Sequence, residues 1–425
     1  MIVIALNPNS KLKKDFSINF PSEYFLVGKI NKYYIYFSSL ECKLVISRAT
    51  ERINRIFAER KPLPPFIYPL VITIFVTTEC NLNCNYCYAK GAKTISPWQR
   101  FNSVKDFLDL SIKDNPVDRV RFQGGGEPTL DIDLIKKTIS YAKNKYNIKK
   151  FEIQTNLLFP EKVAKFIAKN FSYVYGSVDG PEEIQFKNRG ITSNQNKIIE
   201  RNLCYLAKKI PHFSVKCTVS RYSNKRMKEI IDYFWKKGVR NIIFEPIFKM
   251  GKAEKSENDF NTPPSLSNFL KEFLKIKKYA ERKKVFAFSC FLPLEYSGVY
   301  YCGGVSCSPC LTTDGYISTC DEHFLGENDK SPFIIGKIEE RGKRIIYNRE
   351  NISSLRKRNV LNLKTCENCF LKWSCRGQCP SRVFAETGDI YKPNKKKCNL
   401  VKKYSKDYLL YKAREILRNK NEEKL

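Results

Sequence analysis

The chain has 425 residues, and its hydrophobic content of 42% is enough for a large folded core and excludes a disordered chain. Lys and Arg number 76 against 43 Asp and Glu, which gives a formal net charge of +33. The longest apolar stretch, residues 66–76, is broken by Tyr, Pro and Thr, and the start MIVIALNPNSKLKK has too short an apolar core for a signal peptide. We therefore expect a cytoplasmic protein with no membrane partner.

Residues 1–68 are predicted to form a small β-rich N-terminal region. Residues 23–39, EYFLVGKINKYYIYFSS, indicate a hairpin whose turn lies at residues 28–32. The sequence ATERINRIFAER (49–60) predicts a helix, and KPLPPF (61–66) predicts a linker to the next region.

Residues 69–283 alternate between short β-branched runs and helical stretches. The runs are 70–78, 118–125, 151–156, 172–180, 213–220 and 240–247. This alternation predicts an α/β fold with a parallel sheet, either open or closed into part of a barrel. A polar or glycine-rich sequence follows each run: the cysteine triplet, GGGEP, QTN, SVDG, TVS and FEP. Because such folds bind ligands at the carboxyl ends of their strands, we expect one active site at that edge.

Residues 284–400 are rich in Cys and poor in helix or strand periodicity, and residues 401–425 predict a basic helix that docks on the body. The chain has 16 cysteines and only two histidines. In a reducing compartment, clustered cysteines indicate metal rather than disulfides. Thiolate-rich sites favour zinc or iron–sulfur clusters.

The triplet Cys80, Cys84 and Cys87 has the spacing C-x3-C-x2-C, with Tyr86 directly before the last cysteine. Three thiolates on a tight loop can hold three irons of a four-iron cluster and leave the fourth iron open to another ligand. A zinc knuckle with incidental glycines downstream is the alternative interpretation.

The stretch CNLNCNYC resembles the cluster-binding loop of radical S-adenosylmethionine (radical SAM) enzymes. The resemblance implies a partial (β/α)6 TIM-like barrel, a 4Fe-4S cluster on the triplet, and S-adenosyl-L-methionine (SAM) bound at the open iron and cleaved to a 5′-deoxyadenosyl radical. GGGEP looks like the Gly-Gly-Glu motif of that family, so Gly125, Gly126 and Glu127 would accept the SAM amino group. The other SAM-binding positions that the resemblance implies are Tyr86, Gln154, Asn156, Ser177, Asp179 and, for the SAM carboxylate, Arg189.

The sequence CENCFLKWSCRGQC, with GYISTC upstream, looks like the SPASM domain of peptide-modifying radical SAM enzymes, which binds two auxiliary 4Fe-4S clusters. The resemblance assigns one cluster to Cys302, Cys307, Cys320 and Cys379, with Cys310 as the alternative to Cys307. It assigns the other cluster to Cys366, Cys369, Cys375 and Cys398. A zinc ribbon is the alternative for four of these thiolates. Asp321 matches the position of a proposed general base in sulfatase-maturing relatives, and a solvated loop carboxylate is the alternative there.

These resemblances predict an enzyme that modifies a residue of a peptide or protein substrate and takes electrons from a donor such as ferredoxin or flavodoxin. An anaerobic sulfatase maturase that forms formylglycine is the first alternative. An RNA-modifying radical SAM enzyme and a non-catalytic electron carrier are the others. The net charge favours a polyanionic partner, but the lysines are scattered, so we interpret them as solvated faces and expect no nucleic acid.

Overall fold

The computed structural model of the chain describes residues 2–6, 24–47, 71–89, 101–112, 117–254, 262–327, 330–339 and 344–422. The chain divides into two compact units, which we describe separately. The barrel unit comprises Tyr68–Ser289 and Gly303–Arg356, and the cysteine-rich unit comprises Met1–Ile67, Cys290–Cys302 and Lys357–Leu425. The helix predicted at residues 49–60 and the linker at 61–66 lie outside the described residues.

The barrel unit contains the predicted parallel sheet. Its strands are β5 (Val71–Phe75), β6 (Arg119–Gln123), β7 (Lys150–Thr155), β8 (Tyr173–Ser177), β9 (His212–Val219), β10 (Asn241–Pro246) and β11 (Phe286–Phe288). They pair in chain order, each parallel to the next. The six predicted strands and the α/β fold class are therefore confirmed, and β11 is a further short strand.

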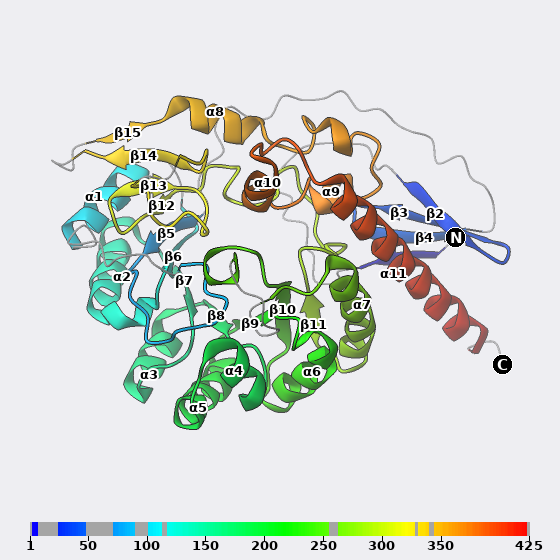
Figure 1. Ribbon diagram of the computed structural model, residues 1–425, viewed down its shortest axis with the longest axis horizontal. Helices are drawn as coiled ribbons and strands as arrows, with labels where there is room; N and C mark the ends of the chain where they lie inside the picture. Colours follow the sequence, from blue (N-terminus) through cyan, green and yellow to red (C-terminus); the bar gives the residue numbers. More distant parts are fainter. Residues whose placement is uncertain are drawn as a thin grey trace. The chain divides into compact units, whose positions relative to one another are not determined.

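Helices cover the outer face of this curved sheet (Figure 1). They are α1 (Phe101–Ile112), α2 (Ile132–Tyr146), α3 (Glu161–Asn170), α4 (Glu182–Arg189), α5 (Ser193–Lys209), α6 (Met227–Lys236) and α7 (Leu266–Arg282). Several begin at a residue that caps the free backbone N–H groups: Asp131 accepts from Leu134 N at 3.0 Å, and Thr192 and Gln195 form a capping box at α5. The short 3-10 helices of the unit are η2 (Pro128–Asp131), η3 (Asn224–Arg226) and η4 (Gly251–Glu254).

Alternate strand positions of the parallel sheet differ in chemistry, as the period of two requires. Side chains such as Ile72, Val120, Phe122 and Phe244 are fully buried in the apolar core. The intervening positions carry Thr, Arg, Glu, Gln, Tyr and Lys, which contact one another across neighbouring strands. We call this second face the lumen face; it is polar, unlike the packed apolar interior of a closed eight-stranded barrel.

Residues 303–356 extend the same sheet. The strand β12 (Cys310–Leu311) pairs in parallel with β5, and β13 (Tyr316–Ser318), β14 (Ile334–Ile338) and β15 (Ile345–Tyr347) follow in antiparallel order. The helix α8 (Arg349–Lys357) comes next. Strands of two to five residues are too short to show periodicity in the sequence. The sequence therefore predicts this segment as part of the cysteine-rich region 284–400, whereas its strands belong to the sheet of the barrel unit.

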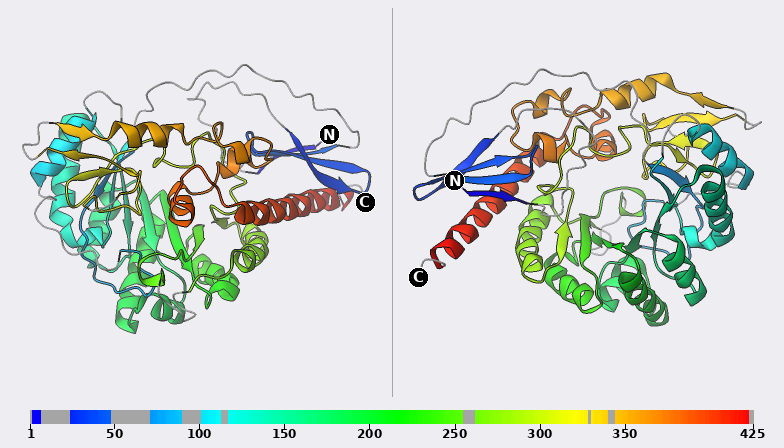
Figure 2. Two further views of the ribbon diagram at one scale, coloured as in Figure 1. Left: turned by 45° about the horizontal axis from the view of Figure 1, so that its top comes forward. Right: turned by 180° about the vertical axis from the view of Figure 1, so that it is seen from behind.

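The cysteine-rich unit holds an antiparallel sheet of four strands in the order β1 (Ile2–Ala5), β4 (Lys43–Ser47), β3 (Tyr33–Ser38) and β2 (Phe25–Ile30). The predicted hairpin is β2–β3, with Asn31 in the left-handed region at φ 51°. The helix α11 (Lys395–Glu422) lies along this sheet (Figure 2), where a Cβ atom built on Gly28 would lie 3.0 Å from Leu410 Cδ2. The shorter helices are η5 (Lys364–Cys366), α9 (Lys372–Cys375) and α10 (Pro380–Thr387), and Cys379 is the residue directly before α10. Within the described ranges, no helix is both long and apolar enough to cross a membrane.

Candidate active site

The loop that carries the cysteine triplet is attached by its backbone to the glycines after β6. The N–H of Gly126 donates to the carbonyl of Thr77 at 3.1 Å, and the N–H of Glu127 donates to the carbonyl of Glu79 at 2.7 Å. A Cβ atom on Gly126 would lie 1.8 Å from the Glu79 oxygen. Only glycine therefore permits this approach, and the GGGEP sequence is needed to seat the loop.

Glu127 is buried, and its carboxylate accepts hydrogen bonds from other residues of the protein. Its Oε1 accepts from the hydroxyls of Thr129 and Thr155, both at 2.6 Å, and its Oε2 accepts from the Asn156 N–H at 2.7 Å. Burial raises the pKa of the Glu127 carboxyl, although these hydrogen bonds act in the opposite direction. The Glu127 side chain thus joins the ends of β6 and β7, and its contact with the SAM amino group stays a prediction.

The thiols of the triplet lie among donors that suit an anionic ligand set. Asn156 Nδ2 lies 3.9 Å from Cys80 Sγ and donates to Asn81 Oδ1 at 2.8 Å. Burial raises the pKa of the Cys84 thiol to about 11, and the cation of Arg189 acts in the opposite direction. A thiol with such a donor and cation beside it can be held as a thiolate by a metal cluster. The donor chemistry therefore fits a 4Fe-4S cluster.

A single metal ion is not indicated by the geometry. Among the residues that the structure describes, no group of three or more His, Cys, Asp or Glu side chains is arranged to hold one ion. A zinc knuckle needs such convergence, whereas the cysteines of a cubane cluster each bind a different iron. Zinc stays the alternative interpretation of the triplet.

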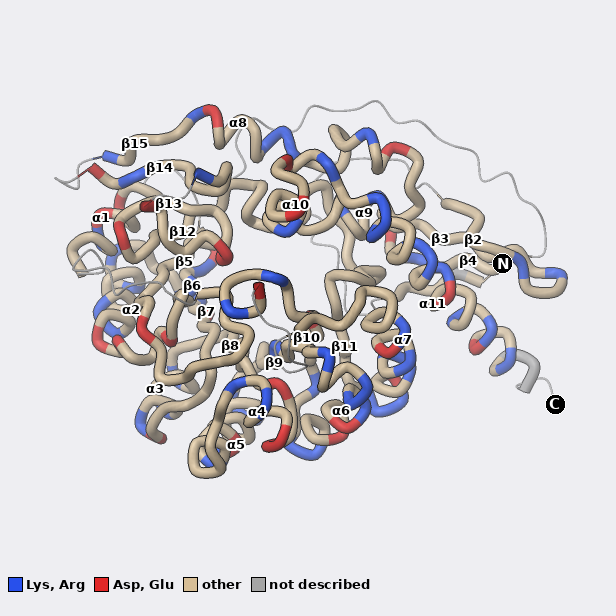
Figure 3. Tube along the Cα trace, viewed as in Figure 1, with Lys and Arg blue, Asp and Glu red and all other residues tan. Residues whose placement is uncertain are grey.

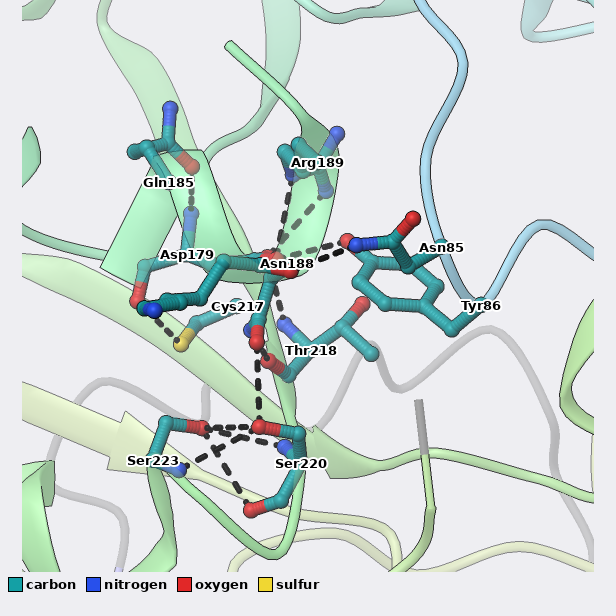
Figure 4. Close-up of polar contacts among 11 residues, drawn as sticks. Asn85, Tyr86, Asp179, Gln185, Asn188, Arg189, Cys217, Thr218, Ser220 and Ser223 are labelled. Carbon is teal, nitrogen blue, oxygen red and sulfur yellow. Dashed lines mark hydrogen bonds and ion pairs between the residues drawn. The ribbon is translucent and has the colours of Figure 1, made fainter. Parts of the chain in front are cut away.

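Asp179 organises the second group of predicted SAM-binding residues (Figure 4). It is fully buried and accepts from Tyr86 Oη at 2.7 Å, Asn188 Nδ2 at 3.2 Å, Thr218 N at 2.9 Å and Arg189 Nη2 at 3.1 Å. The Arg189 guanidinium also lies over the Tyr86 ring at 5.6 Å. Because Tyr86 belongs to the triplet loop, this network ties the loop to the carboxyl ends of β8 and β9.

Asn188 forms a second link between the triplet loop and α4. Its carbonyl accepts from the N–H of Asn85 at 2.9 Å, and its side-chain oxygen accepts from the Ser220 hydroxyl at 3.0 Å. The sequence drew attention to Arg189 and Asp179 but not to Asn188. The only sequence signal for it was its position directly before Arg189 at the end of a helix.

The lumen face below this edge carries charges that the sequence analysis missed. Arg121 on β6 pairs with Asp321 at 2.8 Å and donates to Thr73 Oγ1 at 3.0 Å. Lys216 on β9 donates to the predicted site residue Gln154 on β7 and lies over the Tyr175 ring at 5.2 Å. The alternation of charged with apolar residues in RVRFQ and SVKCT could have revealed Arg121 and Lys216.

Ser177 and Asp321 reach the same lumen face from different elements. Ser177, at the end of β8, is half-buried and lies in register with Lys216 of β9. Asp321 follows Cys320 after β13, and its carbonyl accepts from Tyr88 Oη at 3.4 Å. The structure thus brings Gln154, Ser177 and Asp321 to one face, together with Arg121 and Lys216.

The two cysteines that compete for one ligand position differ in their surroundings. Cys310 lies on β12, is buried, and packs with Phe75 and Phe324. Cys307 is half-buried in a turn with φ 60°, and its sulfur is 4.0 Å from the Ile352 carbonyl oxygen. Packing in an apolar cluster is typical of a structural thiol. The Cys310 thiol also lies beside Thr73 and Arg121 of the lumen face, so the choice between Cys307 and Cys310 stays a prediction.

The second predicted ligand set is brought together in the cysteine-rich unit. Cys366, Cys369, Cys375 and Cys398 line one small pocket. Of the first set, Cys302 and Cys379 belong to this unit, whereas Cys307 and Cys320 belong to the barrel unit. The second set thus has its four thiols around one hollow, and the first set stays a prediction.

Comparison with known proteins identifies the chain. Residues 74–244 match the family model of the radical SAM superfamily. The chain is 30% identical over 211 residues to an uncharacterized protein of Methanocaldococcus jannaschii, and the matched region covers 48% of this chain and 70% of that protein. It is 24% identical to a cysteine-type anaerobic sulfatase-maturating enzyme of Clostridium perfringens, over 71% of this chain and 86% of the enzyme.

A solved structure shows the same fold at low identity. The structure of native anSMEcpe with bound AdoMet and a peptide matches with a TM-score of 0.63 at 20% identity, and the match covers 82% of this chain and 99% of that one. The residues 74–244 that match the family model include the triplet loop, the glycine turn and the Asp179 network described above. The chain therefore belongs to the radical SAM superfamily, and it is an enzyme that uses the cofactors of that superfamily, SAM and a 4Fe-4S cluster.

Proposed function

We propose that this enzyme modifies a residue of a peptide or protein substrate. The observation that carries the proposal is the position of the triplet loop at the carboxyl ends of β6 to β9, directly beside a polar, charged lumen face. The sequence similarity to a sulfatase-maturating enzyme and the peptide in the solved anSMEcpe structure support a peptide substrate. The SPASM-like cysteine pattern supports the same substrate class.

Different residues of the site would bind the cluster and SAM. Cys80, Cys84 and Cys87 would bind three irons of the cluster. The glycine turn at residues 124–126 and Glu127 would receive the SAM amino group, and Arg189, held by Asp179, would face the SAM carboxylate. When bound, these cofactors supply a carbon-centred radical that takes a hydrogen atom from the substrate.

The remaining predicted SAM contacts come from the strand ends. Gln154, Asn156 and Ser177 offer amide and hydroxyl groups to the ribose and carboxylate of SAM. Tyr86 is fixed by its hydrogen bond to Asp179, so it would form one rigid wall of the SAM site. Rigid walls matter because an error of 1 Å in the position of the reacting group is costly.

Asp321 would receive a proton from the substrate while the substrate radical is oxidised. Its ion pair with Arg121 at 2.8 Å orients the carboxylate on the lumen face before the substrate arrives. The two predicted ligand sets would hold auxiliary 4Fe-4S clusters, which would supply an acceptor for the electron that the substrate radical loses. An external donor such as ferredoxin or flavodoxin would supply the first electron.

An anaerobic sulfatase maturase is the second candidate function. It is favoured by the 24% identity to the Clostridium perfringens enzyme and by the position of Asp321 directly after Cys320. It would oxidise a Cys or Ser side chain to formylglycine. RNA modification has less support, because Lys and Arg lie along many helices of both units with Asp and Glu among them (Figure 3).

Anaerobic reconstitution with iron and sulfide tests the proposal. Three clusters correspond to about twelve irons per chain. With dithionite and SAM, the protein should release 5′-deoxyadenosine, and Cys84→Ala should abolish this release. Retention of the release in that variant would contradict the cluster assignment. Turnover of short peptides with a central Cys or Ser separates the sulfatase-maturase activity from other peptide modifications.

A further inference from the structure

Arg358 of the cysteine-rich unit is a fully buried arginine whose hydrogen bonds all go to backbone carbonyls. Its Nε donates to the carbonyl of Ile390 at 3.0 Å, and its Nη1 donates to that of Arg376 at 3.1 Å. Its Nη2 donates to the carbonyls of Gly377 at 2.5 Å and Gln378 at 3.2 Å. The guanidinium fork therefore binds three successive carbonyls of one loop.

That loop joins Cys375 to Cys379 and has a strained backbone. Arg376, Gly377 and Gln378 have φ values of 52°, 77° and 67°, which place all three in the left-handed region. Residues other than glycine persist in that region only where their surroundings impose it, and such strain concentrates at functional sites. A Cβ atom on Gly377 would lie 2.2 Å from Leu363 Cδ1, so a larger residue there would displace the buried Leu363 side chain. Arg358 is the surrounding group that binds the carbonyls of all three.

The left-handed turn also directs donors at sulfur. Gln378 Nε2 donates to Cys398 Sγ at 2.9 Å, and the Gln378 N–H donates to the Cys375 carbonyl at 3.3 Å. Burial raises the pKa of the Cys375 thiol, and the backbone N–H groups of Gln378 and Gly377 act in the opposite direction. Successive N–H groups in such turns form concave sites for anions. The loop is thus arranged for thiolates rather than for neutral thiols.

The charge of Arg358 has no carboxylate partner in the described part of the chain, where no Asp or Glu oxygen comes within 4.0 Å of its guanidinium. A buried cation without a counter-ion is strongly unfavourable. Burial lowers the pKa of Arg358, and the groups that act in the opposite direction are the cysteines 302, 379, 366 and 375. Cys302 and Cys379 belong to one predicted auxiliary ligand set, and Cys366 and Cys375 belong to the other.

We propose that Arg358 is the buried counter-ion of the auxiliary clusters, and that it also pins the loop which carries Cys375 and Cys379. This inference rests on the proposed function, because it requires the auxiliary 4Fe-4S clusters. A cluster with thiolate ligands is anionic and becomes more so on reduction, so a fixed buried cation stabilises its reduced state. Arg358 therefore sets how readily the auxiliary clusters accept an electron.

The test compares the reconstituted full-length enzyme with Arg358→Met, which removes the charge, and Arg358→Lys, which keeps it but loses the planar fork. Lys402→Met is the matched control, because Lys402 lies on the rim of the same thiol pocket and is partly exposed to solvent, which screens its charge. Iron content and redox titrations followed by electron paramagnetic resonance are measured for each protein.

We expect Arg358→Met to shift the reduction equilibrium of an auxiliary cluster at least tenfold toward the oxidised state, which is about 59 mV for one electron. Arg358→Lys should stay within about threefold of the parent equilibrium, and Lys402→Met should do the same. The cluster on the triplet should be unchanged in all variants. Equal potentials in Arg358→Met and the parent enzyme would overturn the proposal.

Two other outcomes remain informative. If Arg358→Met does not load its clusters, the potential of Arg358→Lys decides: a large shift despite the retained charge would show that Arg358 only shapes the loop, which overturns the counter-ion role. If the parent enzyme binds about four irons, the auxiliary clusters are absent and the proposed function itself fails. Failure of the inference is therefore distinguishable from failure of the proposed function.

Discussion

The glycine turn after β6 gives the sharpest prediction about the cluster loop. In Gly126→Ala, the new Cβ would lie 1.8 Å from the Glu79 carbonyl oxygen and 2.4 Å from the carbonyl carbon. Both contacts are with backbone, so no rotamer change relieves them. The loop must move by about 1.2 Å merely to reach a 3.0 Å separation, which is still a tight contact.

The cost follows from the contacts that this displacement breaks. Overpacking typically costs about 1–3 kcal/mol. The backbone hydrogen bonds of Gly126 and Glu127 to the loop contribute about 1 kcal/mol each. The anchored position of the loop should therefore be weakened by about 3–5 kcal/mol. Because the contacts that are lost belong to the triplet loop and not to the strand pairing of the sheet, we expect loss of the cluster with little change in melting temperature.

Iron analysis after anaerobic reconstitution measures this effect. We expect Gly126→Ala to bind about eight irons instead of about twelve and to release no 5′-deoxyadenosine. Gly298→Ala is the control, because its Cβ would lie 3.5 Å from the nearest atom, an ordinary contact. A Gly126→Ala protein with full iron content and parental SAM cleavage would refute the reasoning that the glycine turn seats the loop.

Three further predictions concern other parts of the molecule. Asp179→Asn leaves the Arg189 cation buried without its counter-ion, so urea denaturation should show a loss of about 3–5 kcal/mol, and a change below 1 kcal/mol would contradict the network. Cys307→Ala should lower the iron content, whereas Cys310→Ala should lower only the melting temperature; the reverse pattern would exchange their assignments. Burial opposes the charge of Asp109, but hydrogen bonds from three side chains of α2 outweigh it and lower the pKa of its carboxyl. Since the pKa of Asp109 is lower in the folded than in the unfolded protein, Asp109→Asn should lower the free energy of unfolding by about 0.5–1 kcal/mol near pH 7. This difference between variant and parent should vanish as the pH falls through the lowered pKa, and denaturation measured over a range of pH would show it.

The sequence alone determined the parallel sheet and predicted the edge at which its active site lies. Alternation of β-branched runs with helical stretches is a local property, and the strands β5 to β10 lie where it predicted them. The triplet spacing and the GGGEP sequence likewise carry their chemistry in adjacent residues. The glycines proved necessary for a reason that the sequence did not reveal, namely the backbone of residues 77–79 that packs against them.

Tertiary structure decided the relations that join distant residues. The ion pair of Arg121 with Asp321 joins β6 to the loop after β13, far away in the chain, and the short strand β12 pairs with the edge of β5. The buried Arg358 gave no signal in the sequence, because burial and the absence of a carboxylate partner among the described residues are properties of packing. Spacing thus predicts which residues can bind a cofactor, whereas the folded chain decides which charges surround it.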